Sequence, residues 1–180
     1  MVNRILKIIF VVFCVVTLGY LLLPNYDFPK PPPDSLQSQE PADLESPLRQ
    51  SYFTNFTRAE VITWYMNQFD HSSFLGLKIP TFLQNYPPEE AQTLIRDQTG
   101  STFLQEIVHP FRESIYVNGF EPPSKNDEPI FFVGGKHYHL KIIIRLIPSP
   151  TWMRIGSFVL SVALICVLYK AWYKALVNKK

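Results

Sequence analysis

The chain contains almost no cysteine, and none in its central part. Its two cysteines, Cys14 and Cys166, both lie inside long apolar segments near the ends. A framework of disulfide bonds is therefore excluded for the residues between them. A metal site with cysteine ligands is excluded there as well. The central part must fold on its own hydrophobic core.

Acidic residues are missing from both ends of the chain. All 15 lie between Asp27 and Glu128, so the formal net charge of +2 conceals two basic ends and a slightly acidic middle. Lysine and arginine next to membrane spans favour the cytoplasmic side. The terminal basic residues are Arg4, Lys7, Lys170, Lys174, Lys179 and Lys180. The middle has no basic stripe of the kind that binds nucleic acid, so no nucleic-acid partner is expected.

Sequence patterns of common catalytic and phosphate-binding sites are also absent. The motifs G-x-S-x-G, H-E-x-x-H and G-x-G-x-x-G do not occur. Gly134-Gly135-Lys136 lacks the spacing of a phosphate-binding loop. We therefore assign no catalytic, cofactor-binding or metal-binding residue from the sequence, and we expect no cofactor.

What the sequence does contain is two apolar segments, residues 5–23 and 151–173. Each is long enough to cross a bilayer as a helix, which takes about 20 residues. Aromatic residues typical of the membrane surface mark the second segment: Trp152, Tyr169, Trp172 and Tyr173. The first segment could instead be a signal peptide, but its apolar run ends in Leu-Leu-Leu-Pro, without a small-residue cleavage site. We expect it to be retained as an anchor.

These segments predict a plasma-membrane or inner-membrane protein with two spans. By the charge rule, residues 1–4 and the basic tail 174–180 are cytoplasmic, and the part between the spans lies on the other side. The lipid bilayer is thus the first partner that the sequence predicts.

A proline-rich stretch, residues 24–50, follows the first span. It contains seven prolines among serine, glutamine, glutamate and aspartate. Proline removes backbone donors and disfavours both helix and sheet. We expect an extended linker that lifts the following domain off the membrane. The alternative is a ligand for a proline-recognising domain.

Residues 51–150 carry the signals of a folded domain. Thr57 and Glu60 form a capping-box pattern ahead of an apolar stripe, which predicts a helix of about three turns. A second helix is expected from Pro87, with its buried face formed by Ala91, Leu94 and Ile95.

Strand signals dominate the rest of this domain. Residues 102–108 and 112–117 favour strands, and Asn118-Gly119 is expected to end the second one. Residues 130–133 and 136–147 flank Gly134-Gly135, a pair suited to a tight hairpin turn. The longer arm alternates between apolar and more polar residues, as a half-buried antiparallel strand does. The expected fold class is α+β: a small extracytoplasmic domain of two helices on a three- or four-stranded antiparallel sheet, between two transmembrane helices.

Two groups of polar residues deserve a chemical interpretation. His137 and His139 share a strand face and could bind zinc or copper if a third ligand were near; Glu106, His109 and Glu113 are the candidates in kind. The simpler interpretation is two partly exposed polar residues on a strand. The sequence alone places no third ligand.

The second group lies in residues 106–121: Glu106, His109, Arg112, Glu113 and Tyr116. Such residues could perform acid–base chemistry if they converged in a pocket. We expect instead a solvated sheet edge, because alternating strand residues point to opposite faces.

Three functional hypotheses remain. The favoured one is a non-catalytic binding or scaffolding domain on the non-cytoplasmic face, with a protein or a second copy of the chain as partner. The second is a metal-binding or hydrolytic envelope enzyme that uses the polar sheet face. The third is an accessory subunit of a larger membrane complex.

Overall fold

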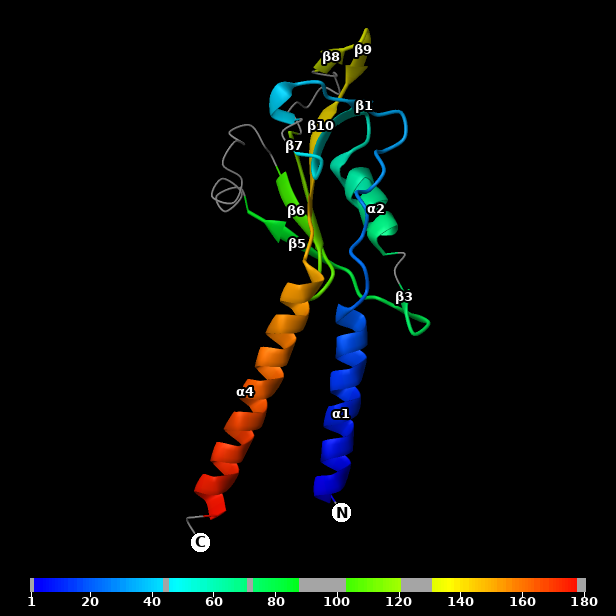
Figure 1. Cartoon of the computed structure of the whole chain (residues 1–180). Coiled ribbons are helices and arrows are strands. Elements are labelled where there is room, and N and C mark those ends of the chain that lie inside the picture. Colours follow the sequence, from blue (N-terminus) through cyan, green and yellow to red (C-terminus); the bar gives the residue numbers. More distant parts are fainter. Residues whose placement is uncertain (1, 44–45, 71–72, 88–102, 121–130, 178–180) are drawn as a thin grey trace. The chain divides into compact units, whose positions relative to one another are not determined.

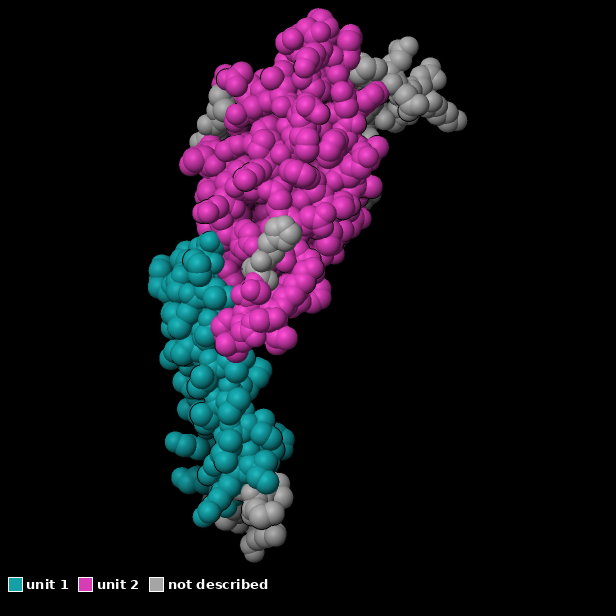
Figure 2. Space-filling model, turned by 90° about the vertical axis from the view of Figure 1, so that its right-hand side faces the viewer, with its two compact units in different colours: residues 1–25, 149–180 teal, residues 26–148 magenta. Residues whose placement is uncertain are grey.

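The computed structural model of this 180-residue chain describes residues 2–43, 46–70, 73–87, 103–120 and 131–177 (Figure 1). The chain divides into two compact units, which Figure 2 colours separately. We call residues 1–25 and 149–180 the helical unit, and Tyr26–Pro148 the α+β unit.

The helical unit consists of α1 (Val2–Leu21) and α4 (Thr151–Val177), which contact each other. Both are long and apolar enough to cross a membrane, over Arg4–Leu21 and Thr151–Leu176. Most of their large apolar side chains are exposed in the protein alone. The expected pair of membrane-length helices is therefore present, as judged by length and composition.

The ends of these helices differ slightly from the sequence prediction. α1 ends at Leu21 and not at residue 23, because Pro24 disfavours a helical conformation in the residue before it. α4 continues past residue 173 to Val177, since Lys, Ala and Leu in its last turn are good helix formers.

The α+β unit is built on a six-stranded antiparallel sheet with the order β1-β2-β10-β7-β6-β5. Its strands are β1 (Leu36–Gln37), β2 (Arg49–Thr54), β5 (Phe82–Tyr86), β6 (Phe103–Val108), β7 (Ser114–Phe120) and β10 (Leu140–Ile147). The predicted three or four strands are therefore too few. The strands that the sequence does not reveal are β1, β2 and β5, which are very short or rich in polar residues.

Two short hairpins extend from this sheet. One pairs β3 (Ser73–Phe74) with β4 (Leu77–Lys78), and the other pairs β8 (Phe131–Val133) with β9 (Lys136–Tyr138). The second turns at Gly134 and Gly135, whose φ angles are +59° and +77°. This confirms the predicted glycine hairpin, although the long arm is interrupted at His139 and continues as β10.

Helix α2 (Arg58–Phe69) covers one face of the sheet (Figure 1). Its predicted capping box is confirmed: Glu60 N–H donates to Thr57 Oγ1, and Thr57 N–H donates to Glu60 Oε2 at 2.8 Å. The helix and the sheet share one hydrophobic core. It contains Tyr52, Val61, Ile62, Tyr65, Phe69, Phe103, Ile107, Ile115, Val117, Leu140, Ile142, Ile144 and Leu146. The predicted second helix from Pro87 falls in residues 88–102, outside the described ones.

Strand β7 runs through the expected stop at Asn118-Gly119, so that prediction is wrong. Gly119 pairs with both Ile142 and Phe103 in the sheet. A Cβ atom on Gly119 would lie 2.8 Å from Cζ of Phe103 and 2.9 Å from the carbonyl oxygen of Lys141. This glycine therefore makes room for an aromatic ring in the sheet and does not form a turn.

The proline-rich segment is not the free spacer that its composition predicts, because it packs on the α+β unit from Tyr26 onward. Tyr26 and Phe28 pack against the hydrophobic core. The carbonyl oxygen of Lys30 accepts hydrogen bonds from Trp64 Nε1 at 3.2 Å and Gln68 Nε2 at 3.1 Å. Proline blocks regular secondary structure, but an extended segment can still bury aromatic and proline side chains.

An ion pair with Lys141 holds the later part of the proline-rich segment. Asp43, in the 3₁₀ turn Pro41–Asp43, is only 3% exposed and lies 2.9 Å from Lys141 Nζ. Burial tends to raise the pKa of Asp43, but hydrogen bonds with Ser38, Lys141 and Ser51 outweigh it and hold the pKa below its usual value. The segment is thus anchored at both ends.

Candidate functional site

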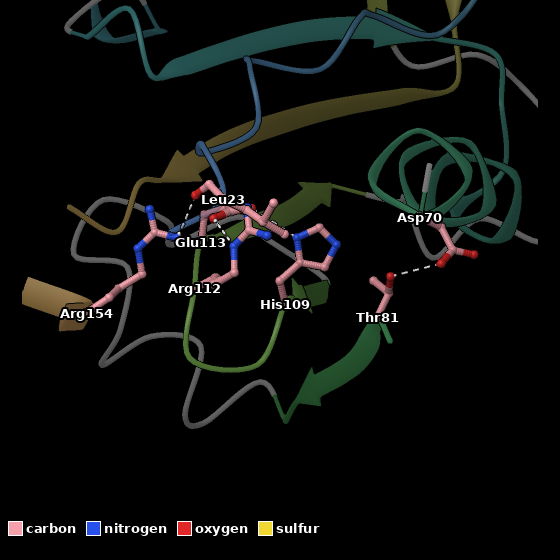
Figure 3. A network of polar contacts seen from close by, with 7 residues as sticks. All are labelled: Leu23, Asp70, Thr81, His109, Arg112, Glu113 and Arg154. Carbon is pink, nitrogen blue, oxygen red and sulfur yellow. Dashed lines mark hydrogen bonds and ion pairs between the residues drawn. The ribbon is translucent and has the colours of Figure 1, made fainter. Parts of the chain in front are cut away.

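Three polar residues of the β6–β7 turn form a buried network (Figure 3). His109 Nδ1 lies 3.1 Å from Glu113 Oε1, and Arg112 Nη2 donates to the same oxygen at 2.9 Å. Arg112 Nε donates to Glu113 Oε2 at 3.3 Å. The side chains of His109 and Glu113 are fully buried, and that of Arg112 is 1% exposed. The predicted solvated edge is therefore wrong for these three residues.

The turn itself brings these residues together. The N–H of Arg112 donates to the carbonyl oxygen of His109 at 3.0 Å, and the N–H of His109 donates to that of Glu113 at 3.2 Å. This folds residues 109–113 back on themselves, so that the carboxylate meets both basic side chains. Strict strand alternation, on which the sequence prediction relied, does not apply in such a turn.

Aromatic rings enclose the network. The His109 ring stacks on Phe69, with centroids 3.9 Å apart and planes 11° from parallel. The Tyr26 ring lies 5.6 Å from His109 and 5.3 Å from Phe69. The network therefore joins the end of β6, the last residue of α2 and the beginning of the α+β unit.

The electrostatics favour an ion pair between Arg112 and Glu113. Burial tends to raise the pKa of Glu113, but the hydrogen bond with His109 and the charge of Arg112 outweigh it and lower the pKa. A buried carboxylate held in this way is ionised near neutral pH. Because the side chains of His109 and Glu113 are fully buried and that of Arg112 is almost fully buried, a substrate has little access to them. The arrangement is that of a structural ion pair.

Glu106 and Tyr116 do not join this network. They lie on the sheet face opposite to α2, since Ile107 and Ile115 face the α2 core. There Tyr86 donates its hydroxyl to Glu106. Burial and the neighbouring carboxylate both raise the pKa of Tyr86, so this phenol stays protonated. The five polar residues of 106–121 are thus divided between two sites.

The two strand histidines, His137 and His139, make different contacts. His137 is exposed in β9, and its ring lies 4.7 Å from the Phe132 ring. His139 lies between β9 and β10, and its backbone N–H donates to Asn55 Oδ1 at 3.1 Å. Among the residues that the structure describes, no three His, Cys, Asp or Glu side chains are grouped to hold a metal ion.

The outer surface of α2 carries a shallow hollow. Six residues line it: Phe56, Ala59, Glu60, Thr63, Trp64 and Asn67. Two aromatic side chains next to a carboxylate are suited to contact with another protein. The sequence predicts the inner face of this helix but gives no signal for the hollow.

Arg154 forms a separate polar contact within the helical unit. It is 5% exposed, donates from Nη1 to the carbonyl oxygen of Leu23 at 3.2 Å, and donates from Nη2 to Thr151 Oγ1 at 2.9 Å (Figure 3). A cation is favourable beside the carbonyl groups at the end of α1. The sequence signal for this contact is a single charge near the start of an apolar helix.

Comparisons with protein-family models, with curated proteins and with solved structures found no match to this chain. The functional argument therefore rests on the geometry of the protein itself.

Proposed function

We propose that the protein is an integral membrane protein that presents a non-catalytic binding or scaffolding domain on the non-cytoplasmic face. The observation that carries this proposal is the chain order: a compact α+β unit lies between two helices of membrane length. The charge asymmetry of the termini supports cytoplasmic ends. The plasma or inner membrane is the proposed location.

The buried state of the polar network favours binding over catalysis. His109, Arg112 and Glu113 are the residues whose types best suit acid–base chemistry, and all three are enclosed. Their arrangement is explained by folding, so the enzyme hypothesis draws no support from them. The metal version of that hypothesis is tested by elemental analysis of the purified protein, with His137→Ala as the control.

The hollow on α2 is the proposed contact surface for a protein partner, which includes a second copy of the chain. Thr63 lines this hollow and is exposed, so Thr63→Arg would obstruct the hollow without entering the core. Gln84→Arg places the same charge on the exposed surface of β5 and serves as the matched control.

The test is chemical crosslinking in living cells, followed by purification of the full-length protein in mild detergent. We expect a discrete crosslinked species that Thr63→Arg reduces strongly and Gln84→Arg leaves intact. Equal yield of this species in the unmodified protein and in both variants would show that the contact lies elsewhere on the protein. If its yield fell only after changes in α1 or α4, the protein would be an accessory subunit that binds through its spans.

A further inference from the structure

Both chain connections leave the α+β unit at the same end. Ile147, the last residue of β10, pairs with Ser114, the first residue of β7. Ser114 directly follows the turn 109–113, and the ring of Tyr26 contacts His109 in that turn. The entry and the exit of the chain therefore both lie beside the β6–β7 turn.

The links from this end to the membrane-length helices are short. Tyr26 is five residues after Leu21, and Thr151 is four residues after Ile147. Even when fully extended, these links span at most about 18 Å and 14 Å. If the helices cross a membrane, this end of the α+β unit must lie close to the lipid surface.

The same end carries exposed apolar side chains. Phe111 in the β6–β7 turn is 85% exposed, and Phe82, which pairs with Val108, is 58% exposed. Leu75 and Leu77 in the β3–β4 hairpin are 75% and 74% exposed. The ion pair between Lys78 and Asp70 holds this hairpin beside the C-terminal cap of α2.

Two of these residues occupy strained backbone positions. The φ angles of Phe111 and Leu75 are +60° and +53°, in the left-handed region where glycine or asparagine is favoured. Such a conformation is unfavourable for a residue with a large side chain. The turns account for these backbone angles, since Leu75 and Gly76 form the two-residue loop of the β3–β4 hairpin and Phe111 lies in the β6–β7 turn. Neither side chain is buried in the folded unit, so both are presented outward.

We propose that Leu75, Leu77, Phe82 and Phe111 form a lipid-contacting end that seats the α+β unit in the interfacial layer of the bilayer. Without this contact, the exposed apolar side chains of the α+β unit would face water directly above the membrane, because the links to the helices are short. Their insertion among the lipid head groups removes this apolar surface from water. The inference rests on the proposed membrane spans.

The test uses the full-length protein in phosphatidylcholine vesicles, with Cys14 and Cys166 replaced by alanine. A fluorophore that is bright in apolar surroundings is attached at Phe111→Cys or at Leu75→Cys. The matched control is Phe132→Cys, because Phe132 is also an exposed aromatic residue, 65% exposed, in the β8–β9 hairpin at the opposite end. Phosphatidylcholine with a spin label near the head group serves as the quencher.

We expect the probe at position 111 or 75 to lose about half of its emission to the lipid-borne quencher, and the probe at 132 to lose little. Equal and weak quenching at all three positions would overturn the proposal. A second protein keeps Cys166, in the middle of α4, as its only cysteine and carries the probe there. With phosphatidylcholine that is spin-labelled deep in its acyl chain as the quencher, this protein separates the two claims. Strong quenching there with none at 111 rejects only the lipid contact, whereas no quenching there rejects the spans as well.

A second variant distinguishes an effect on folding from an effect on the lipid contact. Phe111→Gly relieves the strained backbone, so the unfolding temperature should stay the same or rise, while quenching at position 75 should fall. A large loss of stability in Phe111→Gly would mean that Phe111 serves the fold, which contradicts the proposal.

Discussion

Glu113 is the residue on which the polar network depends. Its carboxylate is shared by His109 and Arg112, and it is fully buried. Removing one partner of a buried ion pair leaves the other charge uncompensated, at a cost of about 3–5 kcal/mol. We therefore expect Glu113→Gln to destabilise the protein by that amount in guanidinium unfolding of the detergent-solubilised chain.

The control for this prediction is Glu40→Gln. Glu40 also pairs with a basic residue, Lys141, at 2.7 Å, but its side chain is 61% exposed. Exposed ion pairs contribute at most about 1 kcal/mol. Equal effects of the two substitutions would show that burial of Glu113 has no energetic consequence.

The same carboxylate makes stability depend on pH. Its pKa in the folded protein is lower than the ordinary value of 4.5, so the unfolded chain takes up protons first on acidification. The contribution to stability is complete above that value and is lost as the pH falls through the folded pKa. We expect the unfolding midpoint to drop progressively as the pH falls below about 4.5, and to drop less in Glu113→Gln.

At the scale of the elements, Gly119 decides how β7 fits between β6 and β10. A Cβ atom there would meet the ring of Phe103 and the backbone of Lys141 at less than 3.0 Å. Overpacking of this kind costs about 1–3 kcal/mol. We expect Gly119→Ala to lower the unfolding free energy by that amount, and Phe103→Leu to restore part of the loss by removing one of the two clashes.

Gly135→Ala is the comparison for this substitution. Its added Cβ would meet nothing within 4 Å, but φ is +77°. We expect Gly135→Ala to lower the unfolding free energy by about 1 kcal/mol, solely because alanine is unfavourable at this φ angle. Phe103→Leu should not restore this loss. Rescue of both variants by Phe103→Leu would contradict the packing account of Gly119.

The elements that could be predicted from the sequence are those with a local signal. The capping box of Thr57 and Glu60 predicts the start of α2, and the alternation in 140–147 predicts β10. β5 gives no such signal, because four of its five residues are exposed. The Asn118-Gly119 pair wrongly predicts the end of a strand. The reason for the glycine is the ring of Phe103, which covers it and comes from another strand.

The sequence predicts which residue types form the polar network, but not that they are buried together. The sequence shows that His109, Arg112 and Glu113 are neighbours, but the burial that makes them an ion pair depends on Phe69 and Tyr26, which lie far away in the chain. No local pattern reports such a contact. The proline-rich segment is a similar case, because Tyr26 and Phe28 find their partners only in the folded unit.

At the scale of the whole molecule, the packed segment after α1 changes how the α+β unit is connected. Tyr26 contacts Phe69 and His109, so we expect Tyr26→Ala to destabilise the unit by about 1–3 kcal/mol in guanidinium unfolding. Pro31→Ala, at an exposed position in the same segment, should cost less than about 1 kcal/mol. No effect of Tyr26→Ala would restore the account in which residues 24–50 are a spacer.

We propose that the α+β unit, which follows one span and precedes the other, lies on the side of the membrane opposite to both termini. Single cysteines are introduced at Lys136→Cys, exposed at the start of β9, and at Lys179→Cys, in the basic tail, after replacement of Cys14 and Cys166 by alanine. Intact cells are then treated with a membrane-impermeant maleimide. The account predicts labelling at position 136 in intact cells and labelling at 179 only after permeabilisation. Labelling at 179 with protection at 136 would contradict it.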